Sequence, residues 1–151
     1  MKEEICIEAF KKEDENEVLM LLSDAKLPTQ DLTPDKLSHF LVARREDGFV
    51  VGTIGIEPYD EVGLLRSLVV HPSYRGSGLG RRLTDELESL AHSHGINTLY
   101  LLTMTAADYF PKLGYQPIER TNVPESISKT EEFKNVCPVS AACLFKHLNP
   151  K

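Results

Sequence analysis

The segment HPSYRGSGLGRRL, residues 71–83, constrains the fold more than any other, because it joins a strand-like stretch directly to a helix-like one. Gly76, Gly78 and Gly80 cost backbone entropy, and the two arginines that follow place positive charge where a helix start favours acidic residues. A bound anion offsets both costs, since glycine lets main-chain N–H groups approach a phosphate at the positive end of a helix. The segment therefore predicts an anion cradle. The alternative is a flexible loop with incidental arginines.

Two well-known glycine motifs do not fit this segment. A P-loop needs a Gly-Lys-Ser/Thr ending, which is absent. A dinucleotide-binding fingerprint belongs to the first strand–helix unit of a chain, whereas several strand-like segments come before residue 71. The remaining interpretation is a backbone cradle for a diphosphate. We expect a side chain at Gly78 or Gly80 to occupy the phosphate position and abolish ligand binding.

The hydrophobic spacing changes from period two to period 3.6 at the glycine segment. The predicted strands cover residues 3–9, 37–46, 49–57, 64–70, 97–104, 115–118 and 139–148, and the predicted helices cover 13–26, 79–94, 106–114 and 124–136. The early strands are joined by short turns and form an antiparallel meander, while the strand–helix–strand unit across 64–103 forms a parallel pair. The pattern predicts a layered α+β (α/β) fold in one domain over residues 1–151.

Composition excludes several classes of protein. The net charge of −6 disfavours a nucleic-acid surface, and no apolar run approaches the roughly 18 residues of a membrane helix. The N-terminus lacks the features of a signal peptide, and Cys6, Cys137 and Cys143 are an odd number without metal-type spacing. We expect reduced thiols in a cytoplasmic protein and no bound metal. Cys137 is either a small buried hydrophobe or a thiol that meets a metalloid at the acceptor site.

Three motifs together resemble the GNAT superfamily of N-acetyltransferases. RGSGLG, residues 75–80, matches the R-x-x-G-x-G/A element of that family; LRSLVVHP, residues 65–72, resembles its fourth strand; and YFPKLGY, residues 109–115, resembles the short helix that closes its motif. The resemblance implies a mixed sheet, flanked by helices, with antiparallel N-terminal strands and parallel fourth and fifth strands splayed around the cofactor. It also implies acetyl-CoA as the donor, with its pyrophosphate on the backbone of residues 75–81.

The resemblance also implies which residues contact the cofactor. The backbone N–H of Leu68 would stabilise the oxyanion, and the backbone of Val70 would bond to pantetheine. Thr103 stands where many relatives carry an asparagine. The full implied set is Leu68, Val69, Val70, Arg75, Gly76, Ser77, Gly78, Leu79, Gly80, Arg81, Thr103 and Phe110. From about residue 48 onward the chain also looks like small acetyltransferases of arsenic-resistance operons.

Acetyl transfer to an amine needs a base that removes the amine proton. The departing thiolate either takes a proton from an acid or leaves without a dedicated acid, since a thiol has a pKa of about 8.5. Glu57 is the candidate base, because it ends an apolar strand before Pro58; the alternative is a turn residue in water. Phe110 stands where the family usually has its tyrosine, and Tyr109 precedes it. One step rotates a helical side chain by about 100°. Tyr109 is therefore either the acid or a packing residue.

Arg66 interrupts an apolar strand, so its guanidinium needs an acidic partner or an anionic ligand. We expect it to face the acceptor pocket and bind a carboxylate or another oxyanion of the acceptor, with Glu57 beside it. The alternative is a structural salt bridge with Glu57 or Glu46. Ser67 points to the opposite face and is a weaker candidate for acceptor binding.

These observations predict an N-acetyltransferase that acetylates a small amine by direct attack in a ternary complex. If the arsenic-operon resemblance is meaningful, the acceptor is an amino-acid-like toxin. One alternative is a protein or peptide N-acetyltransferase, and another is a non-catalytic acyl-CoA-binding sensor. The final strand and residues 121–137 offer a surface for a homodimer.

Overall fold

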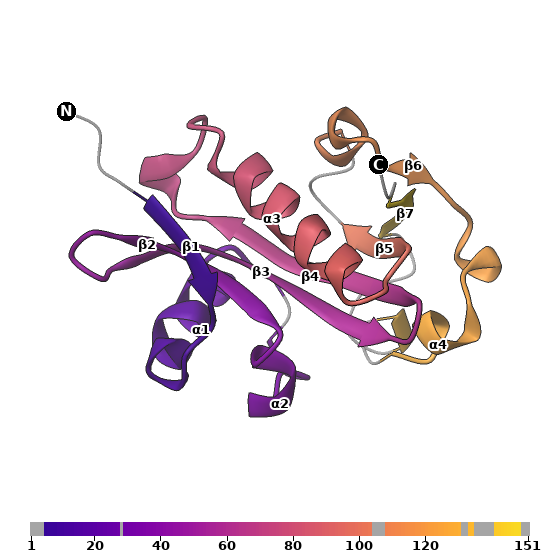
Figure 1. Cartoon of the computed structure of the whole chain (residues 1–151), viewed down its shortest axis with the longest axis horizontal. Helices are drawn as coiled ribbons and strands as arrows, with labels where there is room; N and C mark the ends of the chain where they lie inside the picture. The colour runs from indigo at the N-terminus through magenta and orange to yellow at the C-terminus, as the bar shows by residue number, and fades with distance from the viewer. Residues whose placement is uncertain (1–4, 28, 104–107, 131–132, 135–140, 149–151) are drawn as a thin grey trace.

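The computed structural model describes residues 5–27, 29–103, 108–130, 133–134 and 141–148. They form one seven-stranded sheet of order β1-β2-β3-β4-β5-β7-β6 (Figure 1). The strands are β1 (Ile5–Ala9), β2 (Phe40–Arg45), β3 (Val50–Tyr59), β4 (Val62–Val70), β5 (Thr98–Thr103), β6 (Gln116–Pro117) and β7 (Ala142–His147). The α-helices are α1 (Glu15–Asp24), α2 (Pro34–Leu37), α3 (Leu79–Ser93) and α4 (Glu125–Ser128), and short 3-10 helices cover Lys12–Asp14, Pro72–Tyr74, Phe110–Leu113 and Arg120–Asn122.

The strand directions confirm the predicted mixed sheet. β1 to β4 pair in antiparallel order, β4 and β5 are parallel, and β7 lies antiparallel between β5 and β6. The parallel pair is connected through α3, as expected for a strand–helix–strand unit.

Helices cover both faces of the sheet (Figure 1). On one face, α3 buries Leu79, Leu83, Leu87 and Ala91 against the side chains of alternate residues of β2 and β3. On the other face, α1 and α2 pack against the intervening residues of the same strands, among them Phe40. The alternation of strand side chains, interrupted where the register of β3 shifts, therefore produces apolar layers on both faces of the sheet.

Several predicted elements differ from the structure in extent or type; within the helix predicted over 106–114, for example, the described residues form the 3-10 helix Phe110–Leu113. The strand predicted over 37–46 begins at Phe40, because Thr33 caps the short helix α2 by accepting the N–H of Lys36 at 3.2 Å and Pro34 stands in its first turn. Within the helix predicted over 124–136, the described residues include α4 and a second helical stretch at residues 133–134, where the Lys134 N–H donates to the Thr130 carbonyl at 3.0 Å. The Thr130 hydroxyl donates to the Ile127 carbonyl at 2.8 Å and accepts from the Phe133 N–H at 3.3 Å.

Among the described residues, no helix is both long and apolar enough to cross a membrane. Cys6 is exposed, Cys143 is buried, and both are free thiols. Cys137 lies outside the described residues.

Candidate active site

The pairing of β4 changes at its centre. The parallel ladder to β5 comprises Val62, Gly63 and Leu64 and goes no further. On the other side, β3 pairs Gly55 with Arg66 and Thr53 with Val69, so Ser67 and Leu68 are not in register with residues of β3. Ser67 adopts a left-handed φ of 64°, a conformation that bulges favour and β-strands avoid. A bulge and a splayed strand pair thus meet at Ser67–Leu68, as the family resemblance implied.

The glycine segment forms a tight turn before α3. Gly78 is the N-cap of the helix with φ +85°, and Gly76 has φ +81°. A Cβ on either residue would meet no atom within 4 Å, so backbone conformation rather than crowding favours glycine here. Within the described chain no side chain caps α3, and its first turn contains no acidic residue. The start of α3 therefore has no side-chain cap and open space around its two preceding glycines at the positive end of the helix, which fits a phosphate.

The arginines around this turn take different positions. The Nε of Arg75 donates to the Val70 carbonyl at 3.1 Å, which ties the turn back to the end of β4. Arg82 reaches the Ile5 carbonyl of β1 at 3.1 Å, whereas Arg81 is exposed. Ser77, also exposed, donates to the Tyr74 carbonyl. Among the described residues, the glycine turn and the first turn of α3 thus carry arginines and no acidic side chain.

At Gly80 the structure gives a second reason for glycine, and the expectation that a side chain there would occupy the phosphate position stays a prediction. A Cβ at Gly80 would lie 2.7 Å from the hydroxyl oxygen of Tyr109, so the missing side chain makes room for this tyrosine. Burial raises the pKa of Tyr109, which keeps the phenol protonated at neutral pH. Phe110 is buried in the core, edge-on to Tyr115 with ring centroids 5.4 Å apart. The one-residue offset therefore places the hydroxyl near the start of α3 and the phenyl ring in the core.

A buried network of charged side chains, which we name the charge cluster, lies on the face of the sheet covered by α1 and α2. Its members are Asp31, Lys36, Glu57, Tyr59 and Arg66. The Arg66 guanidinium is 0% exposed and holds Asp31 through two hydrogen bonds of 2.6 and 2.9 Å and Glu57 through one of 2.7 Å. Arg66 Nε also donates to the Ser67 hydroxyl at 3.1 Å. The salt bridge to Glu57, one of the alternatives for Arg66, is thus present.

Glu57 lies inside the protein and not in water. It is 4% exposed, and β3 continues past it to Tyr59, so it does not end its strand as the sequence suggested. The Tyr59 hydroxyl donates to Glu57 at 2.5 Å. Burial and the neighbouring Glu57 both raise the pKa of Tyr59, so Tyr59 remains a neutral donor. The carboxylate is fixed between a guanidinium and a phenol.

Asp31 and Lys36 complete the charge cluster. Lys36 Nζ lies 3.1 Å from Asp31 and 3.8 Å from Glu57, and its side chain is 25% exposed. Burial opposes ionisation of Asp31, but the hydrogen bonds and charges of Arg66 and Lys36 outweigh it and lower the pKa of that carboxyl. Two carboxylates and two cations therefore balance one another.

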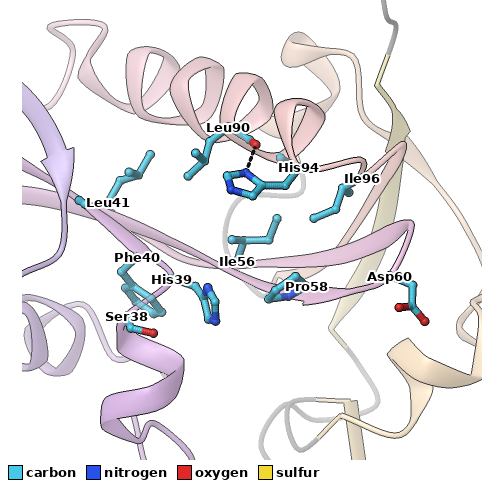
Figure 2. A pocket seen from close by; sticks show the side chains of 12 residues that line it. Ser38, His39, Phe40, Leu41, Ile56, Pro58, Asp60, Leu90, His94 and Ile96 are labelled. Carbon is cyan, nitrogen blue, oxygen red and sulfur yellow. Dashed lines mark hydrogen bonds between the residues drawn. The ribbon is translucent and has the colours of Figure 1, made fainter.

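Two cavities flank the end of β3, one on each side of Pro58. A pocket of about 190 Å³ adjoins the charge cluster and is lined by Asp35, Lys36, His39, Glu57, Pro58 and Tyr59. A larger pocket of about 290 Å³ lies largely on the α3 side, between apolar residues such as Ile56 and Leu90 (Figure 2). Figure 2 also shows the His94 ring turned toward the Leu90 carbonyl, 2.9 Å away. Only the smaller pocket contacts a member of the charge cluster.

The predicted site residues thus fall into two groups. The bulge and the glycine turn lie around the splayed strands, whereas Glu57 and Arg66 lie on the face covered by α2. Leu79 and Val69 are buried in the core, and Thr103, at the end of β5, is half-buried. Among the described residues, no group of three or more acidic, histidine or cysteine side chains has a metal-binding arrangement.

Sequence reasoning missed Asp31, Lys36 and Tyr59. Asp31 stands in LPTQDLTP, a stretch whose composition indicates only a loop. Lys36 looks like an ordinary surface lysine, and Tyr59 looks like a turn residue. Tyr59 bonds to Glu57 on the same strand and Lys36 bonds to Asp31 five residues away. All of these contacts depend on Arg66 of β4, however, which no local signal links to them.

The architecture is that of known acetyltransferases. An N-acetylglutamate synthase from Neisseria gonorrhoeae, solved with coenzyme A and N-acetyl-glutamate, superposes with a TM-score of 0.81 at 19% identity, covering 99% of this chain and 36% of that one. A GNAT-family acetyltransferase from Staphylococcus aureus Mu50 superposes with a TM-score of 0.77 at 22% identity, covering 97% of this chain and 100% of that one. These likenesses confirm the fold class.

The family model of the acetyltransferase (GNAT) domain matches residues 36–117, which is more than half of the 151-residue chain. The protein therefore belongs to the GNAT family, whose acyl donor is acetyl-CoA. An amino-acid acetyltransferase from Pseudomonas putida strain GB-1 is 33% identical over 91 residues, covering 59% of this chain and 21% of that protein. The chain spans only about a fifth to a quarter of the length of such relatives.

Proposed function

We propose that this protein is an acetyl-CoA-dependent N-acetyltransferase whose acceptor is the amine of an amino acid. The observation that carries the proposal is the coincidence of three features on β4: a bulge at Ser67–Leu68, the end of the β5 ladder, and the buried pair of Arg66 with Glu57. The family membership supplies the donor, and the amino-acid acetyltransferases among its relatives support the acceptor class.

The residues present fit the donor. The uncapped start of α3 and the left-handed glycines suit the diphosphate, and the splay beyond Leu64 suits the extended pantetheine arm. When bound, acetyl-CoA supplies the thioester whose carbonyl carbon the amine attacks. Leu68, in the bulge, is the proposed source of the main-chain N–H that stabilises negative charge on the carbonyl oxygen.

Proton transfer is assigned to two side chains. An α-amine is largely protonated at neutral pH, since its pKa is near 8, so a base must remove a proton before or during attack. Glu57 is the proposed base, acting directly or through water, and Arg66 orients it. Tyr109, protonated and close to the start of α3, is the proposed donor to the departing sulfur. Contact of Arg66 with the acceptor remains a prediction that requires displacement of Asp31 or Glu57.

The finer assignments have less support. No observation on the structure favours a peptide acceptor, a silent sensor, an arsenic-related toxin or a dimer over the amino-acid proposal. The arsenic-operon resemblance, the homodimer, the single domain over 1–151 and the cytoplasmic location therefore remain predictions from sequence.

The direct test is release of CoA from acetyl-CoA over a panel of free L-amino acids, simple amines and short peptides. We expect turnover with one or a few amino acids. Turnover with peptides alone would show that the acceptor is a peptide and not a free amino acid. Binding of CoA without any turnover would identify a sensor. Calorimetry with CoA provides the independent check of the donor site.

The Gly78→Ala variant tests the donor site. A non-glycine residue in the left-handed region costs about 1–2 kcal/mol, and the turn relaxes away from the phosphate position. We expect weaker CoA binding in calorimetry, with the acceptor KM unchanged at saturating acetyl-CoA. Gly48→Ala is the matched control, because Gly48 has φ +92° in a hairpin turn distant in sequence from α3. Equal CoA affinity in both variants would contradict the cradle.

A further inference from the structure

We propose that Lys36 binds a carboxylate of the acceptor and so determines its specificity, while Arg66 is a positioning residue. The inference rests on the proposed function and assigns its acceptor subsite. It follows from a difference in accessibility: Lys36 lines the 190 Å³ pocket, whereas the side chain of Arg66 is fully buried behind Asp31 and Glu57.

Arg66 has little capacity left for a ligand. Its guanidinium already bonds to both oxygens of Asp31, to Glu57 and to the Ser67 hydroxyl. An incoming carboxylate would have to displace one of two buried carboxylates and leave it without its cation, which is strongly unfavourable. Arg66 therefore holds its neighbours in place.

Lys36 has the capacity that Arg66 lacks. An ammonium group has three N–H donors. Among the described residues, Lys36 Nζ makes one hydrogen bond, to Asp31 at 3.1 Å, and a looser approach of 3.8 Å to Glu57. A quarter of its side chain is exposed, so an acceptor carboxylate reaches the ammonium without breaking the buried pairs.

The pocket at Lys36 suits one end of a small zwitterion. Its volume of about 190 Å³ corresponds to roughly six water molecules. Lys36 contributes positive charge to the lining, and Asp35 and the buried Glu57 contribute carboxylates. An amino acid carries both charges, so its carboxylate lies at Lys36 and its ammonium is drawn toward the carboxylates.

The test compares enzyme variants that differ in charge at position 36, using acceptors that differ in the charge of one carboxyl group. Steady-state kinetics are measured on the full chain for wild type and for Lys36→Met, with each amino acid accepted in the panel and with the matching carboxamides. For an acidic amino acid the α- and side-chain carboxamides are tested separately. We expect wild type to prefer the carboxylate form by about 10- to 100-fold in kcat/KM, the usual worth of a hydrogen bond to a charged group.

In Lys36→Met, kcat/KM should fall only for the carboxylate acceptor, and the preference should disappear. Lys36→Arg, which keeps the charge, should retain part of it. Lys129→Met is the matched control, since Lys129 is an exposed lysine paired with Glu125 at 3.3 Å on α4, and it should behave as wild type.

Equal losses for the carboxylate and the carboxamides, or an unchanged preference, would overturn the assignment of Lys36 while leaving the proposed function intact. Absence of turnover with every amine would overturn both. Thermal denaturation of each variant shows whether a loss reflects unfolding, and the ratio between the two acceptors is insensitive to the folded fraction.

Discussion

Two aspartate–arginine pairs tie the chain around α1 to the sheet with nearly the same geometry. Asp14, before α1, holds Arg44 of β2 through bonds of 2.6 and 3.0 Å, and Asp31, after α1, holds Arg66 of β4 through bonds of 2.6 and 2.9 Å. We name them the edge pair and the inner pair. Both are planar two-bond contacts between a carboxylate and a guanidinium, the geometry that arginine favours.

The pairs differ in what surrounds them. Arg44 is 16% exposed, and its third partner, Glu8, is 42% exposed. Arg66 is 0% exposed, and its third partner, Glu57, is 5% exposed and lines a pocket. The same bond geometry thus anchors a helix at the sheet edge and, in the interior, holds a second carboxylate ready beside an open space. Burial of the third partner distinguishes a structural pair from a candidate site.

The largest expected effect comes from removing the arginines. Arg66→Met leaves the buried carboxylates of Asp31 and Glu57 with Lys36 as their one remaining cation in the charge cluster, which should cost about 3–5 kcal/mol and lower Tm by roughly 10 °C. Arg44→Met removes the cation from one buried carboxylate, Asp14, which still accepts the Lys11 N–H at 2.9 Å. The expected loss of unfolding free energy is therefore about 1–3 kcal/mol. Denaturant unfolding measures both. A loss in Arg44→Met as large as in Arg66→Met would remove the distinction between the pairs.

The second-largest effect is expected at Glu57, the further carboxylate that Arg66 holds, and Glu8 is its counterpart at Arg44. Glu57→Gln keeps shape but removes the proposed base, so kcat should fall by about 10² or more, with CoA affinity unchanged. Part of the activity should return at high pH, where the free amine becomes abundant without a base. Glu8→Gln, at the edge pair, should leave kcat unchanged. A kcat in Glu57→Gln equal to that of wild type at every pH would exclude Glu57 as the base.

The third effect concerns the aspartates and depends on pH. Arg44 lowers the pKa of Asp14; burial opposes the ionisation of Asp31, but Arg66 and Lys36 lower its pKa overall. A lowered folded pKa stabilises the fold above the unfolded value near 3.9, and this contribution is lost as pH falls through the folded pKa.

Asp14→Asn and Asp31→Asn should therefore each be about 1–2 kcal/mol less stable than wild type at pH 7, with the difference shrinking below about pH 4. Only Asp31→Asn should also raise the acceptor KM, because Asp31 positions Arg66 and Lys36. Unfolding curves from pH 3 to 7 and acceptor kinetics measure the two consequences. A change in KM in Asp14→Asn would show that the edge pair also acts on the site.

The smallest effect is expected at Tyr59. Tyr59→Phe removes one hydrogen bond to Glu57 while Arg66 keeps the carboxylate in place, so about 0.5–1.5 kcal/mol of stability and a few-fold change in kcat are expected. A loss as large as that of Glu57→Gln would give Tyr59 a direct part in proton transfer.

Much of the fold was predictable because its signals are local. The leucine spacing of residues 79–91 places α3 within a residue of its observed bounds, and apolar runs bounded by turns place β3 and β4 within two residues of theirs. Element ends were less predictable. Glu57 was expected at the end of a strand before Pro58, yet the strand continues to Tyr59.

The glycine turn, the helix that follows it and the family were readable from the amino-acid sequence, because each depends on short motifs whose residues are neighbours in the chain. Which charges meet depends on tertiary contacts. Asp31 and Arg66 are 35 positions apart, and the Gly80–Tyr109 contact joins the start of α3 to a turn beyond β5. Such contacts depend on how the chain crosses the sheet. Whether a buried guanidinium faces a ligand or a carboxylate of its own chain is therefore decided by burial and register, which no short sequence pattern encodes.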